Sequence, residues 1–360
     1  MRGRSIRLSL LAGALVLAGG STWAENAPRP LRLIGEAPTA EDPAPRRFVI
    51  DAEIKPGDAP FQSTVEGWFA ALPPASGSGE ISGSCVEARC ALSADLDDGK
   101  IALTGDLAGP AAPSSGRFLV QDDDDKTVGQ GAVSFAPAAG VIPDLGELAA
   151  PDAVSAAELG ELLMWNGSET GFSNLDKDWP DDFEREALAT WQAANGRPMT
   201  GLILIADLAD LRAKTVEAKA AAGWTALGDA AKGWSAGYPA KLLPKARREG
   251  TEQRFDSADG KARLVVAIDP PMTEEAFDAL FDKIKGGEDG RESLSYTKVN
   301  GELEISYRDK GAAVSAVYHN LPGGLARLVF TYPVDQAETY GQFATILPRS
   351  FKVTDDLKAQ

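Results

Sequence analysis

The chain has 360 residues with 36 basic and 53 acidic side chains, so its formal net charge is −17 at pH 7. Its length predicts two or three domains, and its 44% hydrophobic and 25% charged residues exclude wholesale disorder. One histidine, His319, and two cysteines, Cys85 and Cys90, exclude metal sites that need several histidines or cysteines from one chain. The acidic charge argues against nucleic acid and anionic membranes as main partners, and no motif predicts a cofactor.

Residues 1–24 have the three-part pattern of a secretory signal peptide. Arg2, Arg4 and Arg7 precede an apolar run over residues 8–19, and Ala24 is the small residue before the expected cleavage point. The run is shorter than the roughly 20 residues that a membrane-spanning helix needs. We therefore expect an exported, periplasmic protein with no membrane insertion after the signal peptide is cleaved.

A β-rich domain is expected after a short leader. Residues 25–45 are rich in proline and acidic residues, which predicts an extended leader. Over residues 46–136, apolar residues such as Phe48, Ile50 and Ile54 alternate with polar neighbours, which is typical of strands with one buried face.

Two short features of this domain allow a structural and a functional interpretation. In an oxidising compartment Cys85 and Cys90 predict a disulfide, whereas a redox pair usually has Cys-x-x-Cys spacing. The acidic run 122–125 predicts a solvated hairpin tip; a calcium loop is the alternative, but the spacing does not match the EF-hand pattern.

Three helices are expected within residues 155–221. Ser155 with Glu158 forms a capping box at the start of the first helix. The second helix holds Trp191 at core spacing and ends near Asn195-Gly196, and the third extends from about residue 206 to 221.

The second helix ends in a Trp-Gln pair, which is followed by a glycine, a Thr-Gly turn and a last helix with spaced leucines. On this pattern, residues 155–212 resemble the peptidoglycan-binding domain built of three short helices. The resemblance implies weak, non-catalytic binding of glycan in a shallow groove, with aromatic stacking and amide hydrogen bonds. It makes Trp165, Asn166, Trp179 and Gln192 the candidate glycan-binding residues, although Gln192 is also expected to bond backbone near the turn. A longer segment over 168–180 replaces the short loop of the family. The residues that carry the resemblance are Ala187, Leu188, Trp191, Gln192, Ala193, Ala194, Asn195, Gly196, Thr200, Gly201, Leu208 and Leu211.

Residues 223–354 predict an α+β domain. A strand over 263–268 precedes a helix capped by Thr273, and further strands are expected between 293 and 332 before a final helix. This order resembles the PsbP-like antiparallel sheet with flanking helices, and a domain that follows peptidoglycan-binding domains in exported alphaproteobacterial proteins. A basic cluster before these elements predicts a solvated face or a surface for anions; it comprises Lys241, Lys245, Arg247 and Arg248.

No catalytic site is predicted. A serine triad would have to use His319, which is expected to be a lone surface or hairpin histidine, and no Gly-x-Ser-x-Gly motif is present. The segment at Glu169 faintly resembles the catalytic glutamate segment of lytic transglycosylases, but a loop glutamate in water keeps its ordinary pKa.

The sequence as a whole predicts a multidomain α+β protein. We expect an N-terminal β-rich domain, a small three-helix domain and a C-terminal antiparallel sheet with flanking helices. The expected function is that of a non-catalytic periplasmic binding protein that tethers its flanking domains to peptidoglycan. The alternative is a protein–protein interaction module for envelope proteins, in which the helical domain is only a spacer. An enzyme that uses carboxylates is a third, weaker hypothesis.

Overall fold

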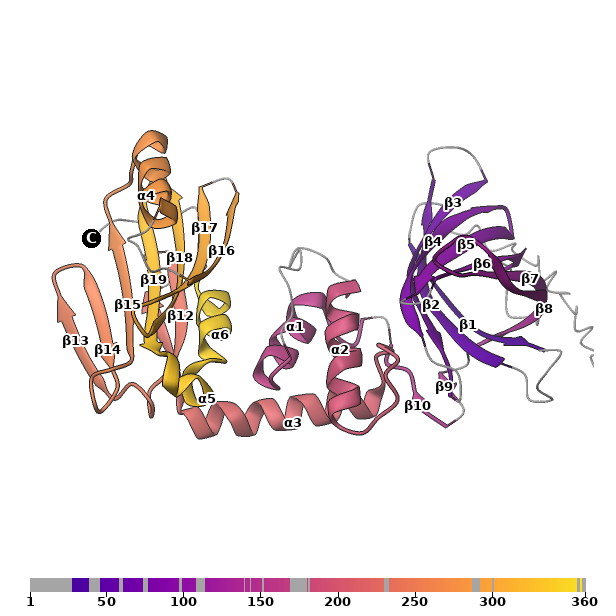
Figure 1. Ribbon diagram of the computed structural model, residues 1–360, viewed down its shortest axis with the longest axis horizontal. Coiled ribbons are helices and arrows are strands. Elements are labelled where there is room, and N and C mark those ends of the chain that lie inside the picture. The colour runs from indigo at the N-terminus through magenta and orange to yellow at the C-terminus, as the bar shows by residue number, and fades with distance from the viewer. Residues whose placement is uncertain are drawn as a thin grey trace, which may run out of the picture.

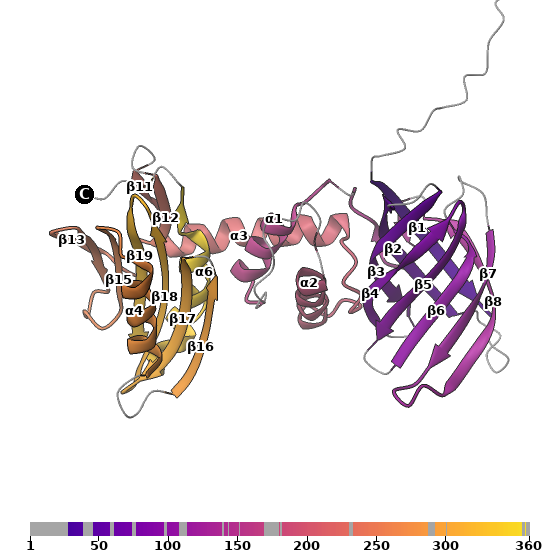
Figure 2. The ribbon, with the colours of Figure 1, turned by 90° about the horizontal axis from the view of Figure 1, so that it is seen from above.

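The computed structural model describes residues 28–38, 46–57, 61–73, 77–96, 99–107, 114–138, 140–142, 144–150, 152–168, 180, 182–229, 233–286, 292–299, 301–354 and 357. These residues form three parts in a row, with a β-barrel at one end, helices in the middle and a sheet with its own helices at the other end (Figures 1 and 2). Within them, no helix is long and apolar enough to cross a bilayer.

The N-terminal part is a closed antiparallel barrel of eight strands among the described residues, in which β8 returns to pair with β1. Alternate apolar residues of the strands meet in one buried interior, where Phe48 packs against Phe69 and Phe135 with ring centroids 5.1 and 6.1 Å apart. The predicted β-rich region is confirmed and closes into a barrel. Its strands are β1 (Arg29–Ala37), β2 (Arg46–Pro56), β3 (Gln62–Ala71), β4 (Ser78–Val86), β5 (Arg89–Leu96), β6 (Gly99–Asp106), β7 (Ser114–Gln121) and β8 (Thr127–Pro137).

The prediction of a leader over residues 25–45 is wrong for Arg29–Ala37, which form β1. This strand pairs with β2 along its whole length and with β8 at its far end, so it closes the barrel. Leu31 and Leu33 are buried while Arg32 between them faces outward to Asp51. The alternation was therefore present in the sequence, although proline and acidic residues on both sides hid it.

The two short features of the barrel have the predicted structural roles. Cys85 and Cys90 form a disulfide across the tip that joins β4 to β5. The acidic run forms the exposed tip between β7 and β8, where the Asp122 carboxylate accepts hydrogen bonds from the backbone N–H groups of Asp124 and Lys126 at 3.1 and 2.9 Å. This carboxylate therefore stabilises the turn itself.

Three helices form at the positions that the sequence predicts: α1 (Ala156–Trp165), α2 (Asp182–Ala194) and α3 (Ile205–Ala222). The hydroxyl of Ser155 accepts a hydrogen bond from the backbone N–H of Glu158 at 3.2 Å, which caps α1 as expected. Apolar residues of all three helices share one buried cluster, which includes Leu159, Leu163, Leu188, Trp191, Leu208 and Leu211. A short hairpin, β9 (Val141–Ile142) and β10 (Gly146–Glu147), lies between the barrel and α1 in the sequence.

The C-terminal part is built on a seven-stranded antiparallel sheet with the order β13-β14-β15-β19-β18-β17-β16. A smaller sheet, β11-β12-β20, stands beside it. The predicted antiparallel sheet with flanking helices is confirmed, but the sequence missed β11–β14. The strands are β11 (Trp224–Asp229), β12 (Trp234–Pro239), β13 (Lys245–Glu249), β14 (Glu252–Asp256), β15 (Arg263–Asp269), β16 (Glu292–Val299), β17 (Glu302–Asp309), β18 (Ala312–Leu321), β19 (Gly324–Pro333) and β20 (Lys352–Val353).

Helices cover both faces of this sheet. On one face Phe277 of α4 (Glu274–Gly286) packs on Leu303 and Leu325, and the hydroxyl of Thr273 caps the helix as predicted. On the other face lies α6 (Phe343–Ser350), whose apolar residues join the cluster of β15, β18 and β19. The prediction of a single final helix is wrong, because α5 (Ala337–Tyr340) and α6 are separate helices that meet at residues 341–342.

Candidate functional site

Trp165, the first candidate glycan-binding residue, is the last residue of α1 and only 4% exposed. Its ring packs edge-on against Trp224 of β11 and Phe343 of α6, with centroids 4.9 and 6.0 Å away. The ring therefore has no free face on which a sugar could stack, which does not fit the predicted glycan-binding role of Trp165. The physical reason is that the end of α1 contributes to the core of the C-terminal part.

Asn166 follows as the C-terminal cap of α1 and holds this helix to α3. Its amide nitrogen donates to the carbonyl oxygens of Leu162 and Leu211 at 2.8 and 3.2 Å and lies 3.1 Å from the hydroxyl of Thr215. These bonds use the amide donors that would have bound an N-acetyl group. Trp179 and Glu169 lie outside the described residues.

Gln192 is fully buried in α2 and has a partner on each side of its amide. Its oxygen accepts from the backbone N–H groups of Thr200 and Gly201 at 3.0 and 2.9 Å. Its nitrogen donates to the carbonyl of Leu202 at 3.1 Å and to the carboxylate of Asp207 at 2.7 Å. The prediction that Gln192 bonds backbone near the turn is confirmed, and no donor or acceptor is left for a glycan.

The turn after α2 also forms the contact with the barrel. The indole N–H of Trp68 on β3 donates to the carbonyl of Thr200 at 2.7 Å. Gly201 has φ +65°, and a Cβ there would lie 2.8 Å from the indole nitrogen of Trp68. The Thr-Gly pair of the motif is thus required for the close approach of the barrel to the helices.

A buried ion pair lies at the same joint. The Arg185 guanidinium of α2 lies 3.0 Å from the Asp51 carboxylate of β2, and both side chains are 1% exposed. Arg32 of β1 approaches the second oxygen of the same carboxylate at 2.9 Å. Apolar residues of the barrel, of the β9–β10 region and of the α2–α3 connection pack next to it; they are Val49, Trp68, Ala70, Leu72, Ile142, Leu148, Leu202 and Leu204.

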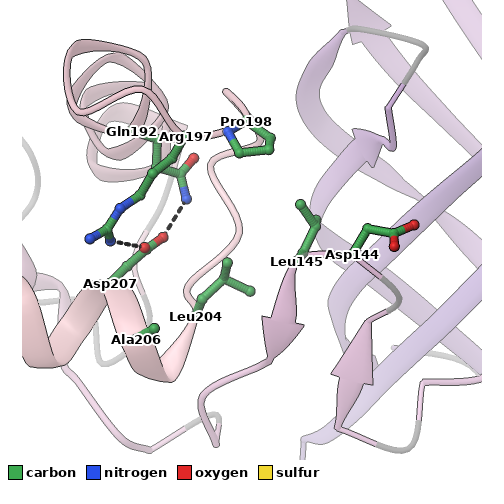
Figure 3. A pocket seen from close by; sticks show the side chains of 8 residues that line it. All are labelled: Asp144, Leu145, Gln192, Arg197, Pro198, Leu204, Ala206 and Asp207. Atoms are coloured by element: carbon green, nitrogen blue, oxygen red, sulfur yellow. Dashed lines mark hydrogen bonds and ion pairs between the residues drawn. The ribbon is translucent and has the colours of Figure 1, made fainter.

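A pocket of about 290 Å³ opens between the β9–β10 hairpin and the α2–α3 connection (Figure 3). Arg197, about one-third exposed, is held over the ring of Trp191 at 4.8 Å by ion pairs with Asp207 and Asp210. Leu145, Pro198 and Leu204 add apolar surface to the lining, and Asp144 lies on the hairpin side. The sequence analysis missed this pocket because one of its walls, residues 144–145, lies in the connection between two predicted domains.

The titratable groups with shifted pKa values lie elsewhere, in the C-terminal sheet. His319 of β18 has one ring nitrogen 3.5 Å from the Glu302 carboxylate, and burial holds the pKa of its imidazole below the ordinary value. It lies close to the turn of the β18–β19 hairpin, so the expected hairpin position is confirmed, whereas its side chain is only 18% exposed and the expected surface position is wrong. Burial also raises the pKa of Glu304, near Arg349. Among the described residues, no group of three or more histidine, cysteine or acidic residues is arranged to hold a metal ion.

Comparison with known proteins gives little further information. No family model and no curated protein matches the chain. A solved structure to which the chain is similar is the solution structure of cyanobacterial PsbP (CyanoP) from Synechocystis sp. PCC 6803. The identity is 15%, the match covers 36% of this chain and 92% of that chain, and the TM-score is 0.27. At this score the similarity supports no inference about function, and the resemblance of residues 155–212 to a peptidoglycan-binding domain stays a prediction.

Proposed function

We propose that this chain is a non-catalytic interaction protein in which the helical part is a rigid spacer that fixes the barrel relative to the C-terminal sheet. One observation carries the proposal: those candidate glycan-binding residues that the structure describes are used inside the molecule. Gln192 and the Thr-Gly pair form the joint with the barrel, and Trp165 forms the joint with the sheet. The periplasmic location expected from residues 1–24 is part of the proposal.

The continuity of α3 supports a spacer role. This helix has 18 residues, about 27 Å at 1.5 Å per residue, and extends from the barrel joint to the sheet (Figure 1). Gly223 ends it in the left-handed conformation and β11 begins at the next residue. The ammonium group of Lys241 donates to the carbonyl of Ala220 at 2.7 Å, so the C-terminal part also caps the helix.

The far end of the barrel supports an interaction role. Phe61 is 75% exposed and has φ +65°, a left-handed conformation that is costly for a side chain of this size. Its carbonyl accepts from the backbone N–H of Glu87 at 2.8 Å, which joins this turn to the disulfide-closed tip of β4 and β5. Val86 on that tip is 57% exposed. Such a fixed, exposed aromatic residue is a favourable anchor for a protein partner.

Co-sedimentation of the mature chain with purified sacculi tests the proposal, at low and at physiological salt. A spacer predicts that the chain stays in the supernatant at both salt concentrations. Pelleting at physiological salt would contradict it.

Peptidoglycan tethering is the second candidate, favoured by the pocket beside the Thr-Gly turn and the partly exposed Arg197. It predicts that the chain pellets with sacculi and that Arg197→Ala abolishes pelleting. The matched control is Arg212→Ala, which removes an exposed arginine of α3 that pairs with Glu158. Equal pelleting of both variants would place glycan binding away from this pocket.

A further inference from the structure

The strand β13 is an open edge of the seven-stranded sheet. It is the outermost strand in the order, and all five of its residues, Lys245–Glu249, are exposed (Figure 1). Among the described residues it pairs with β14 alone. Helix α4 packs on β17, β18 and β19, so it leaves the β13–β14 end of its face uncovered.

The turn between β13 and β14 fixes which backbone groups face the open side. Glu249 pairs with Glu252 across a two-residue loop that begins with Gly250 at φ +62°. In such a hairpin the pair next to the loop is hydrogen-bonded, and alternate residues of the outer strand direct their N–H and C=O groups away from the partner strand. The outward groups of β13 therefore belong to Ala246 and Arg248.

Positive charge is concentrated beside this edge. The guanidinium groups of Arg247, Arg254 and Arg263 lie 3.3, 3.2 and 2.8 Å from the Asp256 carboxylate, on three adjacent strands. Lys245 lies on the same face, because it pairs directly with Asp256, and its ammonium group bonds the carbonyl of Ala258.

The carboxylates on this face do not balance the cations. Lys245 and the three arginines lie near two carboxylates, Asp256 and Glu249, the second partner of Arg247. The next cation on the same face, Arg327, is paired with Glu252 and Asp269, so the face has five cationic side chains and four carboxylates. Each arginine uses a single nitrogen on Asp256, which leaves guanidinium N–H groups for an incoming carboxylate. In a chain of net charge −17, this surplus is a local exception.

We propose that β13 binds an acidic, extended segment of a protein partner, which adds to the sheet as a further strand beyond β13. The outward N–H and C=O groups of Ala246 would pair with the segment, and the arginines around Asp256 would contact its carboxylates. The proposal specifies which kind of partner binds the C-terminal part, and it rests on the proposed interaction function.

A second copy of the chain does not fit this edge. Edge-to-edge pairing of two β13 strands would bring Lys245, Arg247 and Arg248 of both copies together, and like charges on adjacent strands are destabilising. The surplus of positive charge therefore selects an acidic partner.

The test uses the mature chain and a fluorescent ten-residue peptide of alternating glutamate and threonine, followed by anisotropy at physiological salt. The double variant Arg247→Ala/Arg263→Ala removes charge, and we expect it to weaken binding about fivefold, as for the loss of two partly exposed ion pairs. Ala246→Pro keeps every charge but removes one outward donor, and we expect a loss of about fivefold for one hydrogen bond. Arg117→Ala on the barrel and Ala246→Ser, which keeps the donor, are the matched controls.

Three results would overturn the proposal. The first is that the native chain does not bind the peptide, or binds its lysine counterpart equally well. The second is that Ala246→Pro binds as Ala246→Ser does, which would mean charge attraction without strand addition. The third is a dimer in light scattering that Ala246→Pro abolishes, which would make a second copy the occupant.

Folding and the broader function are controlled separately. Circular dichroism of Ala246→Pro should match that of Ala246→Ser; if it does not, amide hydrogen exchange at Ala246 of the native chain, which bound peptide should slow, tests strand addition. Failure of the spacer function appears as pelleting of the chain with sacculi at physiological salt. Failure of the β13 proposal appears in the peptide assay or in light scattering, and neither involves sacculi.

Discussion

The helical part meets its two neighbours through joints of different chemistry. The barrel joint adds polar contacts to its apolar cluster, namely the buried Asp51–Arg185 pair and the indole N–H of Trp68 on a backbone carbonyl. The sheet joint is aromatic, with Trp165 packed on Trp224 and Phe343. A polar joint depends on every partner being present, because a single loss leaves a buried charge or donor without compensation. An aromatic joint loses stability in proportion to the contact area removed.

The largest effect is expected from Asp51→Ala. The substitution leaves the fully buried Arg185 without its carboxylate, so the free energy of unfolding should fall by about 4 kcal/mol. Urea unfolding measures it. Replacing both partners, Asp51→Ala with Arg185→Met, should restore much of the loss, because the buried charge is then gone. A loss below about 1 kcal/mol would show that the pair is hydrated.

Trp165→Ala should have the next largest effect, about 3 kcal/mol, from lost apolar contact and the cavity left against Trp224 and Phe343. In contrast to the polar joint, no second truncation should rescue it, and Trp224→Ala should add further loss. Urea unfolding of the two single variants and the double variant checks this. If the double variant were more stable than Trp165→Ala alone, the proposed difference between the two joints would be contradicted.

Gln192→Leu should cost about 2 kcal/mol, because the backbone N–H groups of Thr200 and Gly201 lose their buried acceptor. Amide hydrogen exchange should report faster exchange at these two residues than in the native chain. Gln62→Leu, at an exposed position of β3, is the control. Equal stability of the two variants would argue against a structural role of the motif glutamine.

The smallest expected effect is a change of the free energy of unfolding with pH, caused by His319 in the C-terminal sheet. Burial lowers the pKa of His319 in the folded chain, so the unfolded chain binds the proton more readily. His319 should therefore reduce stability as pH falls below about 6.5, its ordinary pKa. Its charged neighbours act in opposite directions, Glu302 raising the pKa and Lys352 lowering it. Urea unfolding of the native chain and His319→Gln between pH 7.5 and 5 measures this, and parallel curves would contradict it.

The sequence predicted local structure better than it predicted contacts between the parts. The capping box at Ser155, the helix that holds Trp191 and the disulfide follow from short-range patterns, and each is confirmed. The role of Trp165 depends on Trp224 and Phe343, which are far away in the chain and in another predicted domain. An aromatic residue at a helix end has the same sequence pattern whether it packs on a neighbour or faces a ligand.

There are physical reasons why the sequence analysis missed the strands β13 and β1. All five residues of β13 are exposed, so an edge strand with both faces in water has no apolar alternation to detect. Arg29–Ala37 alternate over only a few residues, and their pairing with β8 is the longest-range contact of the barrel. Closure of a barrel is a non-local property that alternation alone does not specify.

The central claim is that the barrel and the C-terminal sheet are held in one fixed relation. Double electron–electron resonance tests it most directly, with spin labels at Thr64→Cys on β3 and Val299→Cys on β16, both exposed positions. The native disulfide leaves no other described cysteine to label. The account predicts one narrow distance distribution that does not change with salt, whereas a broad distribution typical of a flexible linker would contradict it.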